Sequence, residues 1–190
     1  MATKIDPGTA DFASLVEGLA LKGRTAQRKL AALSSAAKAD ALMQSAAVIR
    51  EDAAVILSAN AQDVADGEAR GLTGAMLDRL TLDPNRLESM ASALEAVAGL
   101  PDPVGDIIDS STRPNGLEIS RVRGPIGLIG IIDESRPTVT ADAAALCVRS
   151  GNAALLRGGS EAAHSNRAIH AAFVRGLTAS GLAPEIASHT

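Results

Sequence analysis

The sequence predicts an α/β protein in which an N-terminal helical region, residues 1–106, precedes part of a Rossmann-like parallel sheet, residues 107–190. Three observations support this class. Apolar residues recur at helical spacing up to residue 98, residues 99–106 interrupt that pattern with two prolines and two glycines, and short apolar runs then alternate with helical patterns. The strand-helix-strand-helix order is typical of a parallel sheet covered by helices. Because two strands do not complete such a sheet, we expect it to be incomplete.

In the helical region, each expected helix is marked by apolar residues on one face and, for most, by a capping residue before it. The Asp83-Pro84 pair is the clearest start, because Asp is a good N-cap and Pro is favoured in the first turn. In chain order the expected helices carry Phe12, Leu15, Val16 and Leu19; Leu42, Ala46 and Ile49 after a cap at Ser34 or Ser35; Ala53 to Leu57; Val64 after a cap at Asn60; Met76 and Leu80 after Thr73; and Leu87 to Val97.

The period changes after residue 106. Residues 117–122 alternate as a half-buried strand does, whereas residues 126–132, IGLIGII, are continuously apolar and predict a strand covered on both faces. Residues 137–149 then predict a helix, residues 153–156 a second buried strand, and residues 160–177 a further helix. Two parallel strands are therefore expected to end at the same edge of the sheet.

Composition excludes several classes of protein. Aromatic residues make up 1% of the chain, which disfavours stacking on nucleic-acid bases. No apolar stretch reaches the roughly 20 residues of a membrane span, and residues 1–12 lack the apolar core of a signal peptide, so we expect a cytoplasmic protein without a membrane or nucleic-acid partner. The single cysteine, Cys147, excludes an internal disulfide and fits a reducing compartment.

The residues Arg157-Gly158-Gly159-Ser160 stand where the second buried strand meets a helix. In an α/β sheet this is the carboxyl edge, where ligands bind, and glycines allow backbone N–H groups to approach an anion. Residues 113–175 also carry eight basic and five acidic side chains, and all eight are arginine. The segment is thus a candidate phosphate site. The alternative is a tight turn followed by Ser160 as an ordinary N-cap, with the arginines as a solvated surface.

The loop after the first buried strand, Asp133-Glu134-Ser135-Arg136, opens onto the same edge, and Pro137 begins the next helix. An arginine there can hold a carboxylate or phosphate through two hydrogen bonds. A capped helix start, with an acidic residue on the helix dipole, is the equally simple alternative.

Other reactive side chains point to structure rather than chemistry. Cys147 lies in an apolar helical segment with no neighbour that would lower its pKa, so we expect a buried structural thiol. His164 and His170 are six residues apart, a spacing that does not place both on one helical face, and no metal-ligand motif is present. We therefore expect no metal site.

Five stretches resemble one family, gamma-glutamyl phosphate reductase, also called glutamate-5-semialdehyde dehydrogenase, of the aldehyde dehydrogenase superfamily. The resemblance runs from the N-terminal helices to about Pro184. The stretches are ILSANAQDV at 56–64, MLDRLTL at 76–82, LPDPVGD at 100–106, RPNGLEISRVRGPIGLIGII at 113–132, and DAAALCVRSGNAALLRGGSEAAHSN at 142–166.

The resemblance implies NADPH-dependent reduction of gamma-glutamyl phosphate to the semialdehyde in proline biosynthesis, through a thioester on a cysteine. It implies an aldehyde dehydrogenase-like fold, with residues 107–190 as the first part of an NADP-binding domain, and it allows a homo-oligomer. The residues implied to bind the cofactor are Arg157, Gly158, Gly159, Ser160 and Glu161, and those implied to bind substrate are Glu134, Ser135, Arg136 and Thr138.

The chain departs from the family in three respects. Asp133 and Thr138 replace an aromatic residue and an asparagine, and residues 183–190, APEIASHT, leave the family pattern where a further strand should begin. Family members are also longer, and their nucleophilic cysteine lies in a glycine-rich part without a counterpart here. We therefore expect an N-terminal part, as a truncated or frameshifted gene would encode, that carries no catalytic residue and is inactive alone. A catalytically silent nucleotide-binding or interaction module is the alternative.

Overall fold

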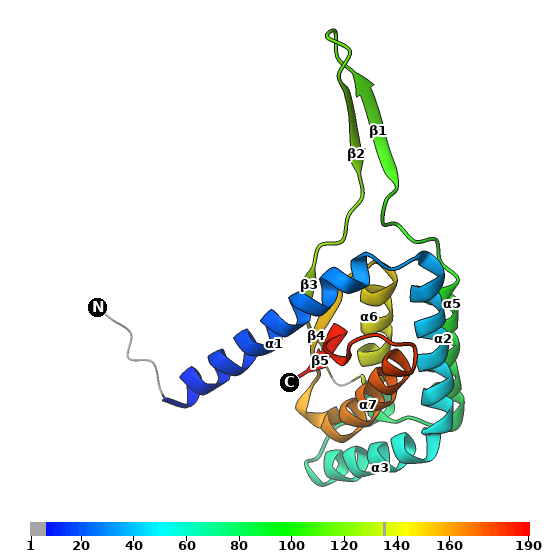
Figure 1. Ribbon diagram of the computed structural model, residues 1–190. Helices are drawn as coiled ribbons and strands as arrows, with labels where there is room; N and C mark the ends of the chain where they lie inside the picture. The colour runs from blue at the N-terminus through cyan, green and yellow to red at the C-terminus, as the bar shows by residue number, and fades with distance from the viewer. Residues whose placement is uncertain (1–6, 135) are drawn as a thin grey trace.

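The computed structural model describes residues 7–134 and 136–190, and it shows a body of helices packed around a short parallel sheet (Figure 1). A hairpin and the first half of the first helix project from this body in different directions. The helices are α1 (Pro7–Ala31), α2 (Ser35–Glu51), α3 (Ala53–Ala69), α4 (Gly74–Leu80), α5 (Pro84–Ala98), α6 (Pro137–Arg149) and α7 (Ala163–Ala179), and two 3-10 turns cover Ser160–Ala162 and Pro184–Ile186. The strands are β1 (Ile107–Thr112), β2 (Glu118–Val122), β3 (Leu128–Ile132), β4 (Ala153–Arg157) and β5 (Ala187–His189).

Three helices begin after residues that the sequence predicts as starts, α2 after Ser34, α4 after Thr73 and α5 after Asp83, and the first and last of these form side-chain caps. The Ser34 side chain accepts a hydrogen bond of 3.2 Å from the Ala37 N–H, and α2 follows. The Asp83 carboxylate accepts one of 2.7 Å from the Arg86 N–H, and α5 follows. Each cap satisfies a backbone donor that the first turn of a helix leaves free, so these two predictions are confirmed.

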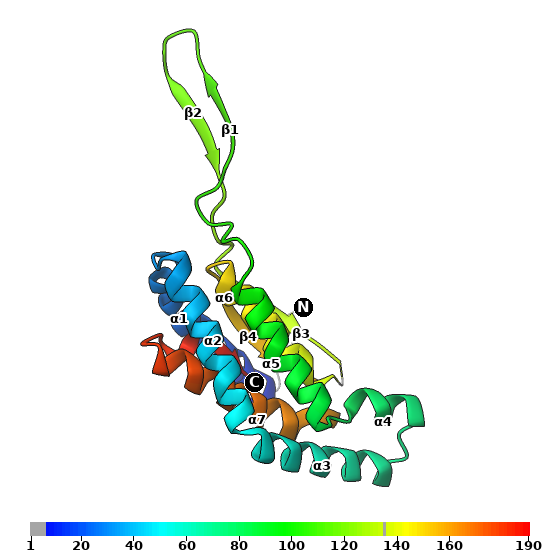
Figure 2. The same cartoon turned by 90° about the vertical axis from the view of Figure 1, so that its right-hand side faces the viewer.

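The predicted break before Asn60 is wrong, because α3 runs through this position without interruption. The Asn60 side chain is buried and bonds across the molecule instead of capping its own helix. Its amide donates to the Leu80 carbonyl at 2.8 Å and to the Ser165 hydroxyl at 3.0 Å, and its oxygen accepts from the Leu82 N–H at 2.7 Å. Asn60 thus joins α3 to the α4–α5 connection and to α7. Helices α4 and α7 both lie next to α3 (Figure 2).

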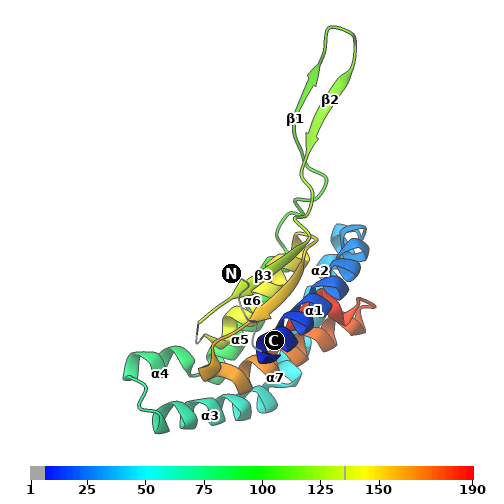
Figure 3. The same cartoon turned by 90° about the vertical axis from the view of Figure 1, so that its left-hand side faces the viewer.

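The sheet has the strand order β3-β4-β5, and both pairs are parallel, as expected for an α/β protein. The central strand β4 is covered on both faces, since its consecutive residues Ala153 and Ala154 point to opposite sides and are both buried. Helix α1 packs against β3 and β4, and α6 packs against β4 (Figure 3).

Strand β3 is an edge strand of the described sheet, and the prediction that it is covered on both faces is wrong. Its last residue, Ile132, is 82% exposed, and Ile126 just before the strand is 80% exposed. A continuous apolar run indicates that both faces of a strand need to be buried, but it does not show whether the described residues bury them. At the other edge, β5 forms within residues 183–190, and its backbone pairs with β4.

Strands β1 and β2 form an antiparallel hairpin that projects from the body. The prediction of a strand at residues 117–122 is confirmed for Glu118–Val122, but the predicted half-burial is wrong, because every residue of both strands is exposed. The partner strand β1 was not expected. Gly116, with φ +84°, supplies the left-handed residue of the connecting turn.

One hydrophobic core joins helices from both sides of residues 99–106. Leu42 and Ile49 of α2, Leu94 of α5, Val148 of α6 and Phe173 of α7 are all buried in it. By contrast, the outer half of α1 exposes its apolar residues, as the 70% exposure of the Phe12 side chain illustrates. None of the helices in the described part of the chain has the length and apolar content that a membrane crossing requires.

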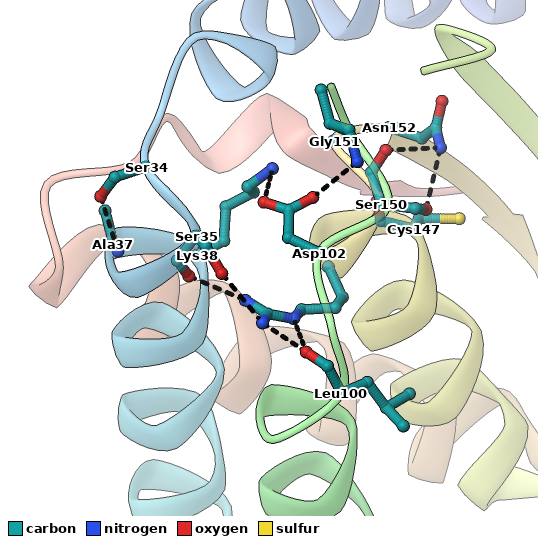
Figure 4. A network of polar contacts seen from close by, with 12 residues as sticks. Ser34, Ser35, Ala37, Lys38, Leu100, Asp102, Cys147, Ser150, Gly151 and Asn152 are labelled. Atoms are coloured by element: carbon teal, nitrogen blue, oxygen red, sulfur yellow. Dashed lines mark hydrogen bonds and ion pairs between the residues drawn. The ribbon is translucent and has the colours of Figure 1, made fainter. Parts of the chain in front are cut away.

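Residues 99–106 are held to the helical body by a polar network (Figure 4). The Lys38 ammonium group, on a side chain 1% exposed, forms an ion pair of 2.5 Å with Asp102. Arg149, at the end of α6, donates to the carbonyl of Leu100 and, at 2.7 Å, to the carbonyl of Ser35. The irregular segment is therefore fixed by buried charges rather than left free.

Candidate functional site

The two loops that the sequence places at one sheet edge do meet there. Strands β3 and β4 end in register at Ile132 and Arg157, and the Asp133 N–H donates to the Arg157 carbonyl at 3.0 Å. Burial raises the pKa of the Asp133 carboxyl, and a hydrogen bond with the backbone of Gly159 opposes that rise. The parallel pairing of β3 and β4 thus places the loops that follow the two strands side by side, as the topology requires.

The loop after β4 opens into a cleft of about 360 Å³, which we call the Arg157 cleft. Four of the five predicted cofactor-binding residues line it, and Glu161 does not. Ser160 lies in a 3-10 turn, and α7 begins at Ala163 without a side-chain cap, so the alternative role of Ser160 as an N-cap is wrong. The lining residues are Arg157, Gly158, Gly159, Ser160, Ala163, Asn166, Arg167, His170, His189 and Thr190.

Gly158 is packed directly against a buried asparagine. A Cβ atom at this position would lie 1.9 Å from the Asn166 amide nitrogen, so a side chain here would displace Asn166. Asn166 is 1% exposed, and its oxygen accepts a hydrogen bond of 3.2 Å from Thr140. Its amide nitrogen is buried and has no partner among the described residues, so this donor is unused.

The positive charge of the Arg157 cleft comes from two arginines, Arg157 and Arg167. The rings of His170 and His189 lie 5.7 Å apart. Burial lowers the pKa of both imidazoles, and for His189 the positive neighbours His170, Arg167 and Arg157 lower it further. His170 Nε2 lies 2.9 Å from the Ala187 carbonyl, and because a carbonyl only accepts, this nitrogen carries the hydrogen. Two fixed cations and an unused amide donor suit a phosphate group.

A second cleft, of about 390 Å³, lies between α4, α5 and the start of α6, and we call it the Arg136 cleft. Of the predicted substrate-binding residues, Arg136 and Thr138 line it. Glu134 is exposed and does not line it, and Ser135 lies outside the described residues. The lining residues are Asp78, Arg79, Thr81, Leu82, Arg86, Ser89, Met90, Ala93, Arg136, Thr138 and Asp142.

Cys147 is buried in α6, as expected, and lines neither cleft. Burial raises the pKa of its thiol to about 11, so the nucleophilic thiolate is scarce at neutral pH. Across residues 7–134 and 136–190, no three His, Cys, Asp or Glu side chains gather to hold a metal ion.

Several cleft residues were missed in the sequence. One face of the predicted helix carries four of them, at the spacing i, i+3, i+4 and i+7: Ala163, Asn166, Arg167 and His170. The three polar residues on this face were the available signal. His189 carried no such signal, because β5 was not expected.

Comparison with known proteins covers almost all of the chain. No family model matched the sequence. The chain is 62% identical over 177 residues to gamma-glutamyl phosphate reductase of Novosphingobium aromaticivorans, covering 93% of this chain and 42% of that relative. The same enzyme of Zymomonas mobilis is 56% identical over 182 residues, again with 42% of its length covered.

Solved structures agree. The crystal structure of gamma-glutamyl phosphate reductase from Thermotoga maritima superposes with a TM-score of 0.88 at 42% identity, over 91% of this chain and 42% of that one. A putative aldehyde dehydrogenase from Bacillus subtilis, at 16% identity, shares the fold with a TM-score of 0.67 over 93% of this chain and 36% of that one. The chain therefore has the aldehyde dehydrogenase fold in part, and it closely matches the N-terminal part, about 42% of the length, of gamma-glutamyl phosphate reductases.

Proposed function

We propose that this chain forms the cofactor-binding and substrate-binding part of an NADPH-dependent reductase of gamma-glutamyl phosphate, an enzyme of proline biosynthesis. The names of the relatives support this reaction, and the chain covers 42% of the Novosphingobium enzyme. The loops after β3 and β4 would serve the substrate and the cofactor, respectively.

The observation that carries the proposal is the chemistry of the Arg157 cleft. The guanidinium groups of Arg157 and Arg167 offer planar donors to a phosphate, and the Asn166 amide offers a further buried donor. Gly158 keeps the backbone close to this donor, where a side chain would not fit. These groups fit the adenosine 2′-phosphate that distinguishes NADPH from NADH.

NADPH, when bound, supplies the hydride of the reduction. The chain's own residues would bind and orient the reactants: Arg157 the cofactor phosphate, and Arg136 and Thr138 the substrate. The nucleophilic thiolate would not come from this chain, because its single cysteine is buried with a pKa of about 11. We therefore expect binding without turnover by this chain alone.

The test is to titrate the purified chain with NADPH and with NADH. Arg157→Ala should weaken NADPH by about 1.5–3 kcal/mol, the range of a hydrogen bond to a charged group, and leave NADH nearly unchanged. The matched control is Arg113→Ala, which removes an exposed arginine beside the hairpin turn. Equal losses for the two cofactors would contradict the phosphate role.

An activity assay with the semialdehyde, phosphate and NADP separates this proposal from the alternative of a silent nucleotide-binding module. NADPH binding without turnover is expected of the chain alone under either reading. Adding the remaining part of the Novosphingobium relative should restore turnover only if the chain is a working part of the reductase.

A further inference from the structure

We infer that the Arg136 cleft binds the α-amino acid head group of the substrate, with Asp142 receiving the ammonium group and Arg136 and Arg79 receiving the carboxylate. This inference rests on the proposed function, since it names the part of gamma-glutamyl phosphate that the cleft would take. It adds Asp142 and Arg79 to the predicted substrate residues.

The fold places these charges around one cavity. Thr138 and Asp142 are four residues apart on α6, so they share one face of that helix, and both line the cleft. Arg136 precedes α6, and Arg79 lines the cleft from α4. The cleft volume of about 390 Å³ falls within the roughly 300–1,000 Å³ typical of small-molecule sites.

The three charged groups are not used elsewhere in the described structure. Among the described residues, neither Asp142 nor either of the arginines Arg79 and Arg136 forms an ion pair or a side-chain hydrogen bond. Arg86, in the same cleft, is different: it forms an ion pair of 2.7 Å with Asp78, and its guanidinium also donates to backbone carbonyls. Arg86 is therefore held in place as part of the cleft wall. The charged groups of Arg79, Arg136 and Asp142 are available to a ligand.

Asp142 is the group that most lacks a counter-charge. It is partly buried on α6, a helix that packs against α5, and burial raises the pKa of its carboxyl without any opposing contact. A cation in the cleft would offset that burial, because an ion pair favours the charged form of a carboxyl. The bound ammonium group of an amino acid is such a cation.

The cleft therefore matches a zwitterion better than a plain dicarboxylate. A dicarboxylate would satisfy the arginines but bring no positive charge to Asp142. Leu82, Met90 and Ala93 supply an apolar wall for the methylene groups between the head group and the reacting carbonyl. An α-amino acid with a short acidic side chain meets all three requirements.

The experiment compares three small probes by nuclear magnetic resonance titration of the labelled 190-residue chain: L-glutamate, glutarate, which lacks the ammonium group, and 4-aminobutyrate, which lacks the α-carboxylate. L-glutamate should shift the amide signals of the cleft residues and bind roughly tenfold or more tightly than either analogue, as expected for one lost charged hydrogen bond. Equal affinity for L-glutamate and glutarate would overturn the inference without any variant.

Variants of the chain test which side chain binds each charged group of the probe. Asp142→Asn should lose the preference for L-glutamate over glutarate, and Arg79→Gln should weaken both of these probes. Asp40→Asn, the same change at an exposed site on α2, should alter neither. An unchanged preference in a folded Asp142→Asn chain would reject the role of Asp142.

NADPH is titrated into the same samples, and its binding depends on the other cleft. If NADPH binds but L-glutamate does not shift the Arg136 cleft, the inference fails while the proposed function survives. Failure of NADPH to bind, with L-glutamate selectivity intact, would count against the proposed function alone.

Discussion

Gly176 of α7 lies against the backbone of Ser45 of α2, so closely that a Cβ atom at position 176 would stand 2.3 Å from the Ser45 Cα atom. The Ser45 hydroxyl lies within hydrogen-bonding distance of two carbonyl oxygens, of Ala41 at 2.9 Å and of Phe173 at 3.0 Å, so its single hydrogen is shared between them. The two helices therefore touch at their backbones, and the contact requires a residue without a side chain.

Gly176→Ala should destabilise the protein for this reason. The added methyl group meets backbone rather than a movable side chain, so α2 and α7 must separate, and we expect the free energy of unfolding to fall by about 1–3 kcal/mol or more. Urea denaturation measures this loss. Gly18→Ala is the control, because nothing lies within 4 Å of a Cβ atom at that helical position, and it should raise stability by about 0.5–1 kcal/mol. Similar behaviour of the two variants would contradict the backbone contact.

Lys38→Met should leave the Asp102 carboxylate buried without its counter-ion, at a cost of about 3–5 kcal/mol in the free energy of unfolding at pH 7. Burial alone would raise the pKa of Asp102, but Lys38 and the Val104 N–H hold it below its ordinary value. The stabilisation is therefore present above the unfolded pKa of about 3.9 and is lost as pH falls through the lowered folded value.

Without Lys38, burial, the largest effect on Asp102, raises the pKa of its carboxyl, so the orphaned carboxylate takes up a proton as pH is lowered toward 4. The variant deficit should therefore shrink over that range, and Asp102→Asn should recover part of it at pH 7. Denaturant titrations at the two pH values measure both effects. A deficit independent of pH would indicate lost packing of the Lys38 stem rather than an orphaned charge.

Acidification should weaken the fold through the histidines beside the Arg157 cleft. Burial lowers the pKa of both His170 and His189 in the folded chain. In the unfolded chain both histidines have the ordinary pKa of about 6.5, so below this pH the unfolded chain binds more protons than the folded chain. Stability should then fall between pH 7.5 and 5.5, and thermal melting shows this directly. The double variant His170→Gln, His189→Gln should flatten the slope, and a slope that survives it would reject this origin.

Native Cys147 should resist alkylation. With its pKa raised to about 11, roughly one thiol in a thousand is ionised at pH 8, and burial blocks access as well. Iodoacetamide should label the denatured chain quickly and the native chain slowly, as mass spectrometry reports. Rapid native labelling would make Cys147 a candidate nucleophile.

The sequence predicted the features that depend on residues close to one another in the chain. Ser34 and Asp83 mark helix starts because an N-cap bonds within three residues of itself, and the parallel pair β3–β4 follows from the order of apolar runs. Asn60 is also a good capping residue, but its partner Ser165 is 105 residues away, and no local pattern reveals such a contact. The break predicted there was wrong for that reason.

The clefts divide in the same way. Arg157 to Ser160 and Arg136 stand at strand ends, so the sheet topology was enough to find them. Asp142 and Arg79 come from helices whose meeting depends on tertiary packing, and His189 comes from a strand of three residues with no periodicity of its own. The burial of β3 was overestimated because the residues of a strand do not show whether that strand lies at the edge of the sheet.

The long sequence separation between α2 and α7 also delays the packing of α2 during synthesis. Ser45 bonds to Phe173, 128 residues further along the chain, and Lys38, Asn60 and Gln27 likewise bond to residues made much later. At roughly 5–20 residues per second, the ribosome completes the partner of Ser45 on the order of ten seconds after Ser45 itself. For that interval the emerging N-terminal helices display apolar faces without their final neighbours, so their burial has to wait until the C-terminal half of the chain has been made.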